Sequence, residues 1–333
     1  MFVAPDFANF KADFAAGLKN MLTPDGLGAF ILVLANSMQD AELRGLLTSA
    51  LQQNFAQLQA NNPPGPVDDR HVFAALAETG IDGLGCWESH QQDVWELVIN
   101  PLRCLRPARV SGEVFSNIHQ PFDPGKFHFN KPFLRPEILW EGFWQGGQMR
   151  VLYNKFPFAP WHLLVVPEPE QTLPQYLSRE HHVRMMTLVA EQADVLPGLG
   201  MAFNSLGAYA SINQLHFQGF VRQQPLPLES SRWQHNGGED AYPLDCFRTA
   251  CAATAWDFIA ECHARNQPYN LLYREDACYV LPRLGQGLLA LPDWAQGIAW
   301  YEICGVFTLA SPAMLDTCTA GSICQQLAAL AVR

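Results

Sequence analysis

The residues best suited to chemistry form a short polar run inside an apolar stretch, QLHFQ. Alternation of polar and apolar residues is typical of a β-strand, in which successive side chains point to opposite faces. Gln214, His216 and Gln218 would therefore share one face, and the two apolar residues between them would point into a core. A histidine can attack phosphorus when one ring nitrogen is held by a hydrogen bond and the other is free. This pattern makes His216 the first candidate for a nucleophile.

Transfer at phosphorus also needs hydrogen-bond donors for the phosphate oxygens, because positioning and charge stabilisation dominate such reactions. The amide of Gln218 is such a donor on the same strand face. Asn204 and Ser211 precede it in the glycine-containing turn NSLGAYAS, and they could bring an amide and a hydroxyl to the same phosphate. A single histidine in a half-apolar strand is more often structural, however, so these residues alone leave both interpretations open.

The segment NSLGAYASINQLHFQ, residues 204–218, resembles the signature of the nucleotidyltransferase and phosphorylase branch of the histidine-triad superfamily. This branch includes galactose-1-phosphate uridylyltransferase, diadenosine tetraphosphate phosphorylase and the GDP-hexose phosphorylases, and the wording LHFQ is most similar to the last of these. The resemblance implies that His216 is the nucleophile and that Gln218 binds the phosphate being transferred. It also implies that Asn204 and Ser211 are phosphate ligands.

Gln214 departs from the family pattern, His-x-His-x-Gln, because it stands where the first histidine is expected. Glutamine can donate and accept hydrogen bonds, but it cannot carry a proton as imidazolium does. We expect Gln214 to take over part of the orienting role of the missing histidine, beside the phosphate. The same departure motivates an alternative function: a non-catalytic nucleotide-binding or regulatory protein with a degenerate site.

Three further stretches resemble the same branch: YNKFPFAPWHLLVVP, PYNLLYREDACYVLPR and FDPGKFHFNKPF. The first of them implies that Asn154, Lys155 and His162 lie near the nucleotide. Together the matches extend over roughly residues 115–310. Several ordered matches are much more specific than one short motif.

The composition limits the partners of the protein. The 333 residues carry a formal net charge of −11, which argues against a polynucleotide partner, since such binding needs clustered lysine and arginine. The expected partners are a nucleotide substrate and inorganic phosphate or a sugar phosphate, and a homodimer is left open. The nine cysteines include no CxxC pair, and we predict no metal site and no cofactor. A divalent metal ion that accompanies the substrate phosphates is left open.

The apolar segment at 26–38 is too short to span a bilayer, and the first residues lack the pattern of a signal peptide. The expected location is therefore cytoplasmic, without a membrane partner.

The order of predicted elements favours an α+β fold. We predict a duplicated histidine-triad-like antiparallel sheet with flanking helices, preceded by a mostly helical N-terminal region. The predicted division is a helical region of unknown role at 1–105 and a nucleotidyltransferase domain at 106–333, with two related halves at about 106–235 and 240–333. Local predictions concern helix caps, one hairpin, one strand and several surface residues. They are N-caps at Asp40, Asp69 and Ser178, a helix end at Gly80, a turn at Gly146-Gly147, a strand at 298–310, and surface positions for His181, His182 and Arg283.

Overall fold

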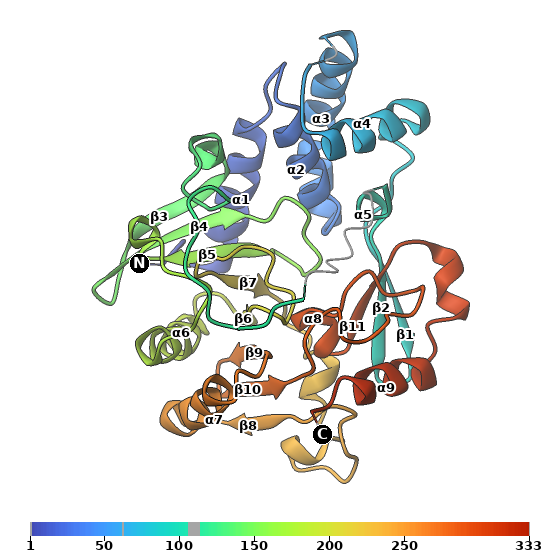
Figure 1. The fold of residues 1–333 in the computed structure, drawn as a ribbon. Coiled ribbons are helices and arrows are strands. Elements are labelled where there is room, and N and C mark those ends of the chain that lie inside the picture. The colour runs from blue at the N-terminus through green and yellow to red at the C-terminus, as the bar shows by residue number, and fades with distance from the viewer. Residues whose placement is uncertain (1, 62, 106–113, 333) are drawn as a thin grey trace.

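The computed structural model describes residues 2–61, 63–105 and 114–332. Its centre is an eight-stranded sheet in which every neighbouring pair is antiparallel (Figure 1). In spatial order the strands are β3 (Ile138–Trp144), β4 (Gly147–Tyr153), β5 (Leu163–Pro167), β7 (Phe217–Val221), β6 (Leu199–Asn204), β9 (Tyr269–Arg274), β10 (Ala277–Pro282) and β8 (Phe247–Thr249). The predicted α+β class with an antiparallel sheet is confirmed.

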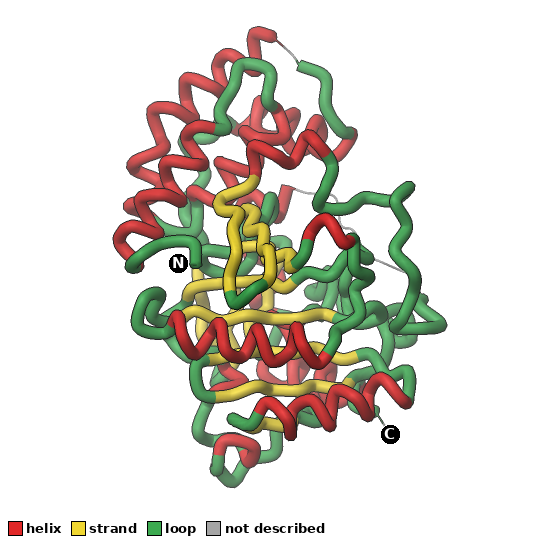
Figure 2. Tube along the Cα trace, turned by 90° about the vertical axis from the view of Figure 1, so that its left-hand side faces the viewer, coloured by secondary structure: helices red, strands yellow, loops and turns green. Residues whose placement is uncertain are grey.

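One face of this sheet is apolar and is covered by helices. Val151, Val165, Met201 and other side chains of alternate positions form a continuous core with these helices. The helices are α1 (Phe7–Asn20), α6 (Arg179–Gln192) and α7 (Ala252–Ala264). Figure 2 brings the face that carries α6 and α7 to the front. The polar residues that the sequence singles out therefore lie on the other face.

The hairpin between β3 and β4 is confirmed, with Trp144 paired to Gly147. Its two connecting residues, Gln145 and Gly146, have φ values of 44° and 80°. Two successive positive φ angles are typical of a type I′ turn, which matches the twist of antiparallel strands and favours glycine at its second position. The turn fixes the register of β4, and β4 ends at Tyr153, directly before the predicted site residue Asn154.

The N-terminal region contributes α1, α2 (Leu27–Ser37), α3 (Ala41–Asn61) and α4 (Val67–Thr79), which lie together above the sheet in Figure 1. Asp40 accepts a hydrogen bond from the backbone N–H of Leu43, so its predicted capping role is confirmed. Gly80 ends α4 with a φ of 75°, also as predicted. The prediction for Asp69 is wrong: Pro66 is the N-cap, and Asp69 lies in the first turn, where it is buried.

A second sheet of three strands joins the N-terminal region to the C-terminal half. Strand β2 (Trp95–Ile99) pairs antiparallel with β1 (Glu88–Gln92) and parallel with β11 (Val306–Leu309). The hairpin of β1 and β2 is absent from the prediction. The single strand expected at 298–310 is wrong, because its first part forms the short helix α8 (Trp300–Ile303). The division of the chain at residue 105 stays a prediction.

The remaining helices are short or terminal. They are α5 (Pro101–Leu105), α9 (Ala320–Ala329) and the 3-10 turns Pro132–Glu137, Pro169–Gln171, Pro227–Glu229, Gln234–Asn236 and Pro312–Asp316. None of the helices in the described ranges combines the length and apolar character needed to cross a bilayer.

Helix α6 begins as predicted, with the Ser178 hydroxyl accepting from the backbone N–H of His181. The surface positions predicted for His181 and His182 are wrong, since both are buried. The ring of His182 lies 3.0 Å from the Tyr273 hydroxyl and 3.0 Å from a carbonyl at the start of α7, so it joins α6 to β9 and α7. Arg283 is also buried, at 1% exposure, and donates to backbone carbonyls.

Gly198 precedes β6 at a position that tolerates no other residue. Its φ is 87°, and a Cβ added there would lie 2.4 Å from the carbonyl oxygen of Arg222. We expect Gly198→Ala to lower the free energy of unfolding by about 1–3 kcal/mol, because left-handed strain and a backbone clash add together. Urea unfolding measures this, and Gly83→Ala is the control, since Gly83 has no atom within 4 Å of its added Cβ. Equal effects of the two substitutions would contradict the prediction.

Candidate active site

His216 lies directly before β7 and is 4% exposed. Its Nδ1 is 2.7 Å from the carbonyl oxygen of Gln214. A carbonyl only accepts, so Nδ1 carries the proton and Nε2 keeps its lone pair. Burial lowers the pKa of His216 to about 4, and the ring is therefore neutral at neutral pH. No group in the described part of the chain forms a hydrogen bond with Nε2, so this nitrogen is in the state that a nucleophile requires.

The backbone of His216 is held by a buried amide that sequence reasoning missed. The backbone N–H of His216 donates to Gln175 Oε1 at 2.9 Å, and Gln175 Nε2 donates to the carbonyls of His216 and Asn204. The β6–β7 ladder ends at the pair of Ala202 and Gln218. The side chain of Gln175 thus replaces the ladder where the two strands separate, and it fixes the spacing between Asn204 and His216.

Gln214 is 1% exposed, and its side chain connects the backbone at Phe129 and at Pro169 to the site. Its Oε1 accepts from the backbone N–H of Phe129 at 2.7 Å, and its Nε2 donates to the carbonyl of Pro169 at 3.2 Å. The ring of Phe129 packs on that of His216, with centroids 5.0 Å apart. Gln214 therefore orients His216 through its backbone carbonyl, while its side chain holds Phe129 over the ring.

We expect Gln214→His to be tolerated, with turnover within about tenfold of wild type. The backbone carbonyl that orients His216 is unchanged, and an imidazole can both accept from Phe129 and donate to Pro169. Gln214→Leu should reduce turnover more, because it leaves the N–H of Phe129 and the carbonyl of Pro169 without their buried partner. Steady-state kinetics of both variants test this, and a greater loss in Gln214→His than in Gln214→Leu would contradict it.

Gln218 has its amide orientation fixed by a tryptophan. The indole N–H of Trp300 donates to Gln218 Oε1 at 2.8 Å. Because an indole nitrogen only donates, the atom beside it must be the amide oxygen, and the –NH₂ group points elsewhere. No described residue accepts from that –NH₂ group, so it is available to a ligand. Trp300 comes from α8, about eighty residues further along the chain.

His162 is the second residue that holds the Gln218 oxygen. Its Nε2 lies 3.0 Å from Gln218 Oε1, and Nε2 must therefore carry the proton. Its Nδ1 then accepts, with the backbone N–H of Phe158 at 3.3 Å and Asn154 Nδ2 at 3.4 Å. His162 is fully buried, and burial lowers its pKa to about 3. The predicted residues Asn154 and His162 thus reach the site through Gln218.

Asn204 is the last residue of β6, and of its buried side-chain amide only the oxygen has hydrogen-bond partners among the described residues. Its Oδ1 accepts from Asn270 Nδ2 at 2.6 Å and from the backbone N–H of Trp300 at 3.2 Å, which fixes its orientation. Its Nδ2 is buried and has no partner among the described residues. An unpaired buried donor costs about 1–3 kcal/mol, so it favours binding of an acceptor such as a phosphate oxygen.

Two predicted phosphate ligands, Ser211 and Lys155, are not connected to His216 or Gln218 by hydrogen bonds between described residues. Ser211 is exposed between β6 and β7, and its hydroxyl has no hydrogen bond within the described ranges. Lys155 Nζ lies 2.8 and 2.7 Å from the two carboxylate oxygens of Asp69 on α4. Phosphate binding by Lys155 would have to compete with this ion pair. The roles of Ser211 and Lys155 in phosphate binding stay predictions.

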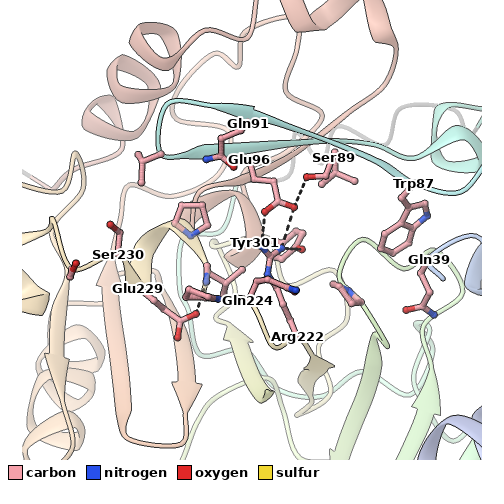
Figure 3. A pocket seen from close by; sticks show the side chains of 17 residues that line it. Gln39, Trp87, Ser89, Gln91, Glu96, Arg222, Gln224, Glu229, Ser230 and Tyr301 are labelled. Atoms are coloured by element: carbon pink, nitrogen blue, oxygen red, sulfur yellow. Dashed lines mark hydrogen bonds and ion pairs between the residues drawn. The ribbon is translucent and has the colours of Figure 1, made fainter. Parts of the chain in front are cut away.

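A separate cavity of about 930 Å³ with mixed polar and apolar lining lies between the β1–β2 hairpin and the chain that follows β7 (Figure 3). At its centre, Arg222 Nη2 is 2.6 Å from a carboxylate oxygen of Glu96, and Arg222 Nη1 donates to the Tyr301 hydroxyl. None of the residues predicted as site residues lines it. The cavity is therefore distinct from the group around His216.

Three buried histidines predict how stability changes with pH. Burial lowers the pKa of His162 to about 3 and those of His182 and His216 to about 4. In the unfolded chain these rings titrate near 6.5, so unfolding takes up protons below that pH. Their contribution to stability is therefore fully present above about pH 6.5 and is lost as the pH falls toward 4. Each ring contributes at most about 1.4 kcal/mol per pH unit. Thermal melts from pH 7.5 to 4 measure this, and a constant melting temperature would contradict it.

Comparison with known proteins places this geometry in context. A family model described as "GDPGP1-like, N-terminal domain" matches residues 98–220, a range that contains every predicted site residue. GDP-D-glucose phosphorylase 1 of Danio rerio is 39% identical over 120 residues, and that of Homo sapiens is 34% identical over 128 residues. GDP-L-galactose phosphorylase 1 of Arabidopsis thaliana is 31% identical over 129 residues.

These matches cover 34%, 36% and 34% of this chain, and only 33%, 32% and 28% of the respective relatives. The sequence similarity thus extends over about a third of each relative's length. The crystal structure of yeast Ap4A phosphorylase Apa2 superimposes over 78% of this chain and 92% of its own, with a TM-score of 0.51 and 15% identity, which shows a shared fold. The predicted resemblance of this chain to the phosphorylase branch of the histidine-triad superfamily is thereby confirmed.

Proposed function

We propose that this protein is a phosphorylase-type nucleotidyltransferase that acts on a sugar nucleotide, with a GDP-hexose as the first candidate substrate. The activities named for the relatives, phosphorolysis of GDP-D-glucose and of GDP-L-galactose, support the substrate class. The site residues predicted from the sequence all fall within the matched range, 98–220. A dinucleoside polyphosphate is the second substrate class to test.

The reaction proceeds in two displacements at one site. His216 Nε2 attacks the α-phosphorus, an N–P bond forms, and the bond from that phosphorus to the bridging oxygen breaks, so that the sugar 1-phosphate leaves. Inorganic phosphate then attacks the nucleotidyl-histidine, the N–P bond breaks, and a nucleoside diphosphate is released. The imidazole is regenerated in the second step. Two displacements through a covalent intermediate imply ping-pong kinetics.

One observation carries this proposal: a neutral histidine with a free Nε2 lies directly before β7, two residues from an amide donor of fixed orientation. The Nδ1 proton of His216 is held by the Gln214 carbonyl, and the oxygen of Gln218 is held by Trp300. The unpaired Nδ2 of Asn204 adds a second donor.

The proposal is tested with a panel of α-³²P-labelled GDP-hexoses and dinucleoside polyphosphates, with and without inorganic phosphate. We expect acid-labile label on the protein when phosphate is omitted, and labelled nucleoside diphosphate when phosphate is added. Parallel reactions with Mg²⁺ and with a chelator determine whether a divalent ion accompanies the substrate. Turnover without any labelled protein, under quench conditions that preserve phosphohistidine, would argue against the covalent step.

A binding-only protein is the rival function, and it is motivated by Gln214 in the place of a histidine. The support of His216 by the Gln214 backbone carbonyl weakens this motivation, because it does not depend on the side chain at position 214. A thermal-shift screen with the same nucleotides distinguishes the two functions. Strong stabilisation by a nucleotide that is never turned over would favour the rival.

A further inference from the structure

The segment from Asn154 to His162 connects β4 to β5, and it carries His162, which holds the Gln218 oxygen, and Asn154, which contacts the His162 ring. Its ends are joined by a hydrogen bond from the backbone N–H of Asn154 to the carbonyl of His162, at 3.2 Å. Within the segment, the N–H of Phe158 donates to His162 Nδ1. The position of the His162 ring, and through it the Gln218 amide, therefore depends on the conformation of this segment.

The N-terminal region holds the first end of the segment. Asn36, at the end of α2, donates through Nδ2 to the carbonyl of Asn154 at 2.9 Å. The next residue, Lys155, forms the two-oxygen ion pair with Asp69 of α4. The side chain of Asp69 is 4% exposed, and that of Lys155 is 29% exposed. A charge-assisted contact that is shielded from water to this extent is a firm attachment between the two parts.

The middle of the segment is held by the end of the same region. Asn100 Nδ2 donates to the carbonyl of Pro157 at 3.0 Å. The guanidinium of Arg103, on α5, lies 5.2 Å from the centre of the Phe158 ring. Both contacts lie at or next to Phe158, whose backbone N–H donates to the His162 ring.

The second end of the segment is strained, and the N-terminal region holds it in that state. Trp161 has a φ of 52°, in a region that bulky residues rarely adopt. Its backbone N–H donates to Gln39 Oε1, and Gln39 Nε2 is in turn anchored on the carbonyl of Asn36 at 2.9 Å. Its indole ring packs edge-on against rings of α1, namely Phe7, Phe10 and Phe14.

We propose that Gln39 and Asp69 are positioning residues of the candidate active site, and that residues 1–105 serve to set its geometry. They fix the two ends of the segment, the segment fixes His162, and His162 and Trp300 together aim the Gln218 amide. The inference rests on the proposed function, because it assigns these residues a role in that reaction. It gives the N-terminal region a role at the site, although no described residue of this region belongs to the group around His216.

The first test needs no catalysis. The indole N–H of Trp300 is identified among the ¹⁵N-tryptophan resonances by its loss in Trp300→Phe, and it reports directly on the Gln218 oxygen. We expect Gln39→Ala to shift this resonance and to increase its solvent exchange. Gln39→Glu keeps an acceptor for Trp161 but loses the donor to Asn36, so it should restore the resonance in part. Gln52→Ala is the control, since Gln52 belongs to the same region and bonds only to the exposed Asp82 within the described structure.

The second test measures turnover. We expect Gln39→Ala and Asp69→Asn to lower kcat about tenfold or more with little change in KM, because a small misplacement of a catalytic group acts mainly on the transition state. In a Gln218→Ala background the same substitutions should lower kcat by less than about twofold, since the amide group that they position is absent. Urea unfolding of each variant separates this coupling from a general loss of stability.

The outcomes separate this inference from the proposed function. An altered Trp300 resonance in a protein that turns over no nucleotide would support the positioning network and refute the function. Normal turnover and an unchanged Trp300 resonance in both Gln39→Ala and Asp69→Asn would overturn the inference while the function stands. Equal kcat losses in the presence and absence of Gln218 would also overturn it.

Discussion

His216→Ala is expected to lower phosphorolysis by at least about 10⁴-fold and to abolish covalent labelling. Loss of a catalytic nucleophile removes the chemical step itself, and the residual rate comes from binding and charge stabilisation alone. The substitution also removes the buried imidazole ring that packs against Phe129, so the stability of the folded state must be measured separately. Quenched-flow labelling with an α-labelled GDP-hexose measures the covalent step, and circular dichroism with urea unfolding measures the fold.

His71→Ala is the matched control, because His71 is an exposed histidine on α4 with no predicted role. It should label and turn over as wild type does. A folded His216→Ala protein that still becomes labelled would show that another residue is the nucleophile.

Gln218→Ala is expected to reduce turnover by about a hundredfold to a thousandfold. Removal of one donor to the developing phosphate charge typically costs about 2.7–4 kcal/mol in the barrier. Gln218→Glu provides the sharper test: its carboxylate still accepts from Trp300 and His162, but it has no N–H to donate and it repels phosphate. We expect the glutamate variant to be folded and at least as inactive as the alanine variant.

The control for these variants is Gln223→Ala, an exposed glutamine just beyond the same strand. Comparison of kcat and KM for the three proteins distinguishes a catalytic donor from a binding contact. Undiminished turnover in Gln218→Glu would rule out donation by this amide, and Gln218 would then only hold the strand packing together.

The hairpin of β3 and β4 could be predicted because its period-two alternation reflects two different faces, and because Gly146 occupies a turn position that needs a positive φ. The β1–β2 hairpin was not predicted, because the sequence of β1, ESHQQ, has no alternation of apolar and polar residues. The strand is largely exposed and needs none. The break at 300–303 was missed because Gly305, with a φ of 94°, separates a buried helical turn from β11 within one apolar run. His182 was misjudged because its two hydrogen-bond partners lie far away in sequence.

The local pattern and the resemblance could single out His216 and Gln218 as the candidate pair. Two of the groups that orient them, Gln175 and Trp300, could not be predicted, because each reaches the site from elsewhere in the fold. Gln175 lies about forty residues before His216, and Trp300 about eighty residues after Gln218. No spacing rule connects positions that meet only when the sheet and α8 are assembled. The same holds for Gln39 and Asp69, whose partners follow them by 122 and 86 residues.

The parallel pairing of β2 with β11 has a consequence for how the chain folds during synthesis. Glu96 pairs with Val306, so the ribosome must release more than two hundred further residues before β2 can acquire this neighbour. Until then the edge of β2 that later receives β11 is bare, and open strand edges attract other chains. Contacts of such sequence separation also close slowly. We therefore expect the three-stranded sheet to be the last part of the protein to form, and nascent chains that stop short of β11 to depend on chaperones and to aggregate when these are withheld.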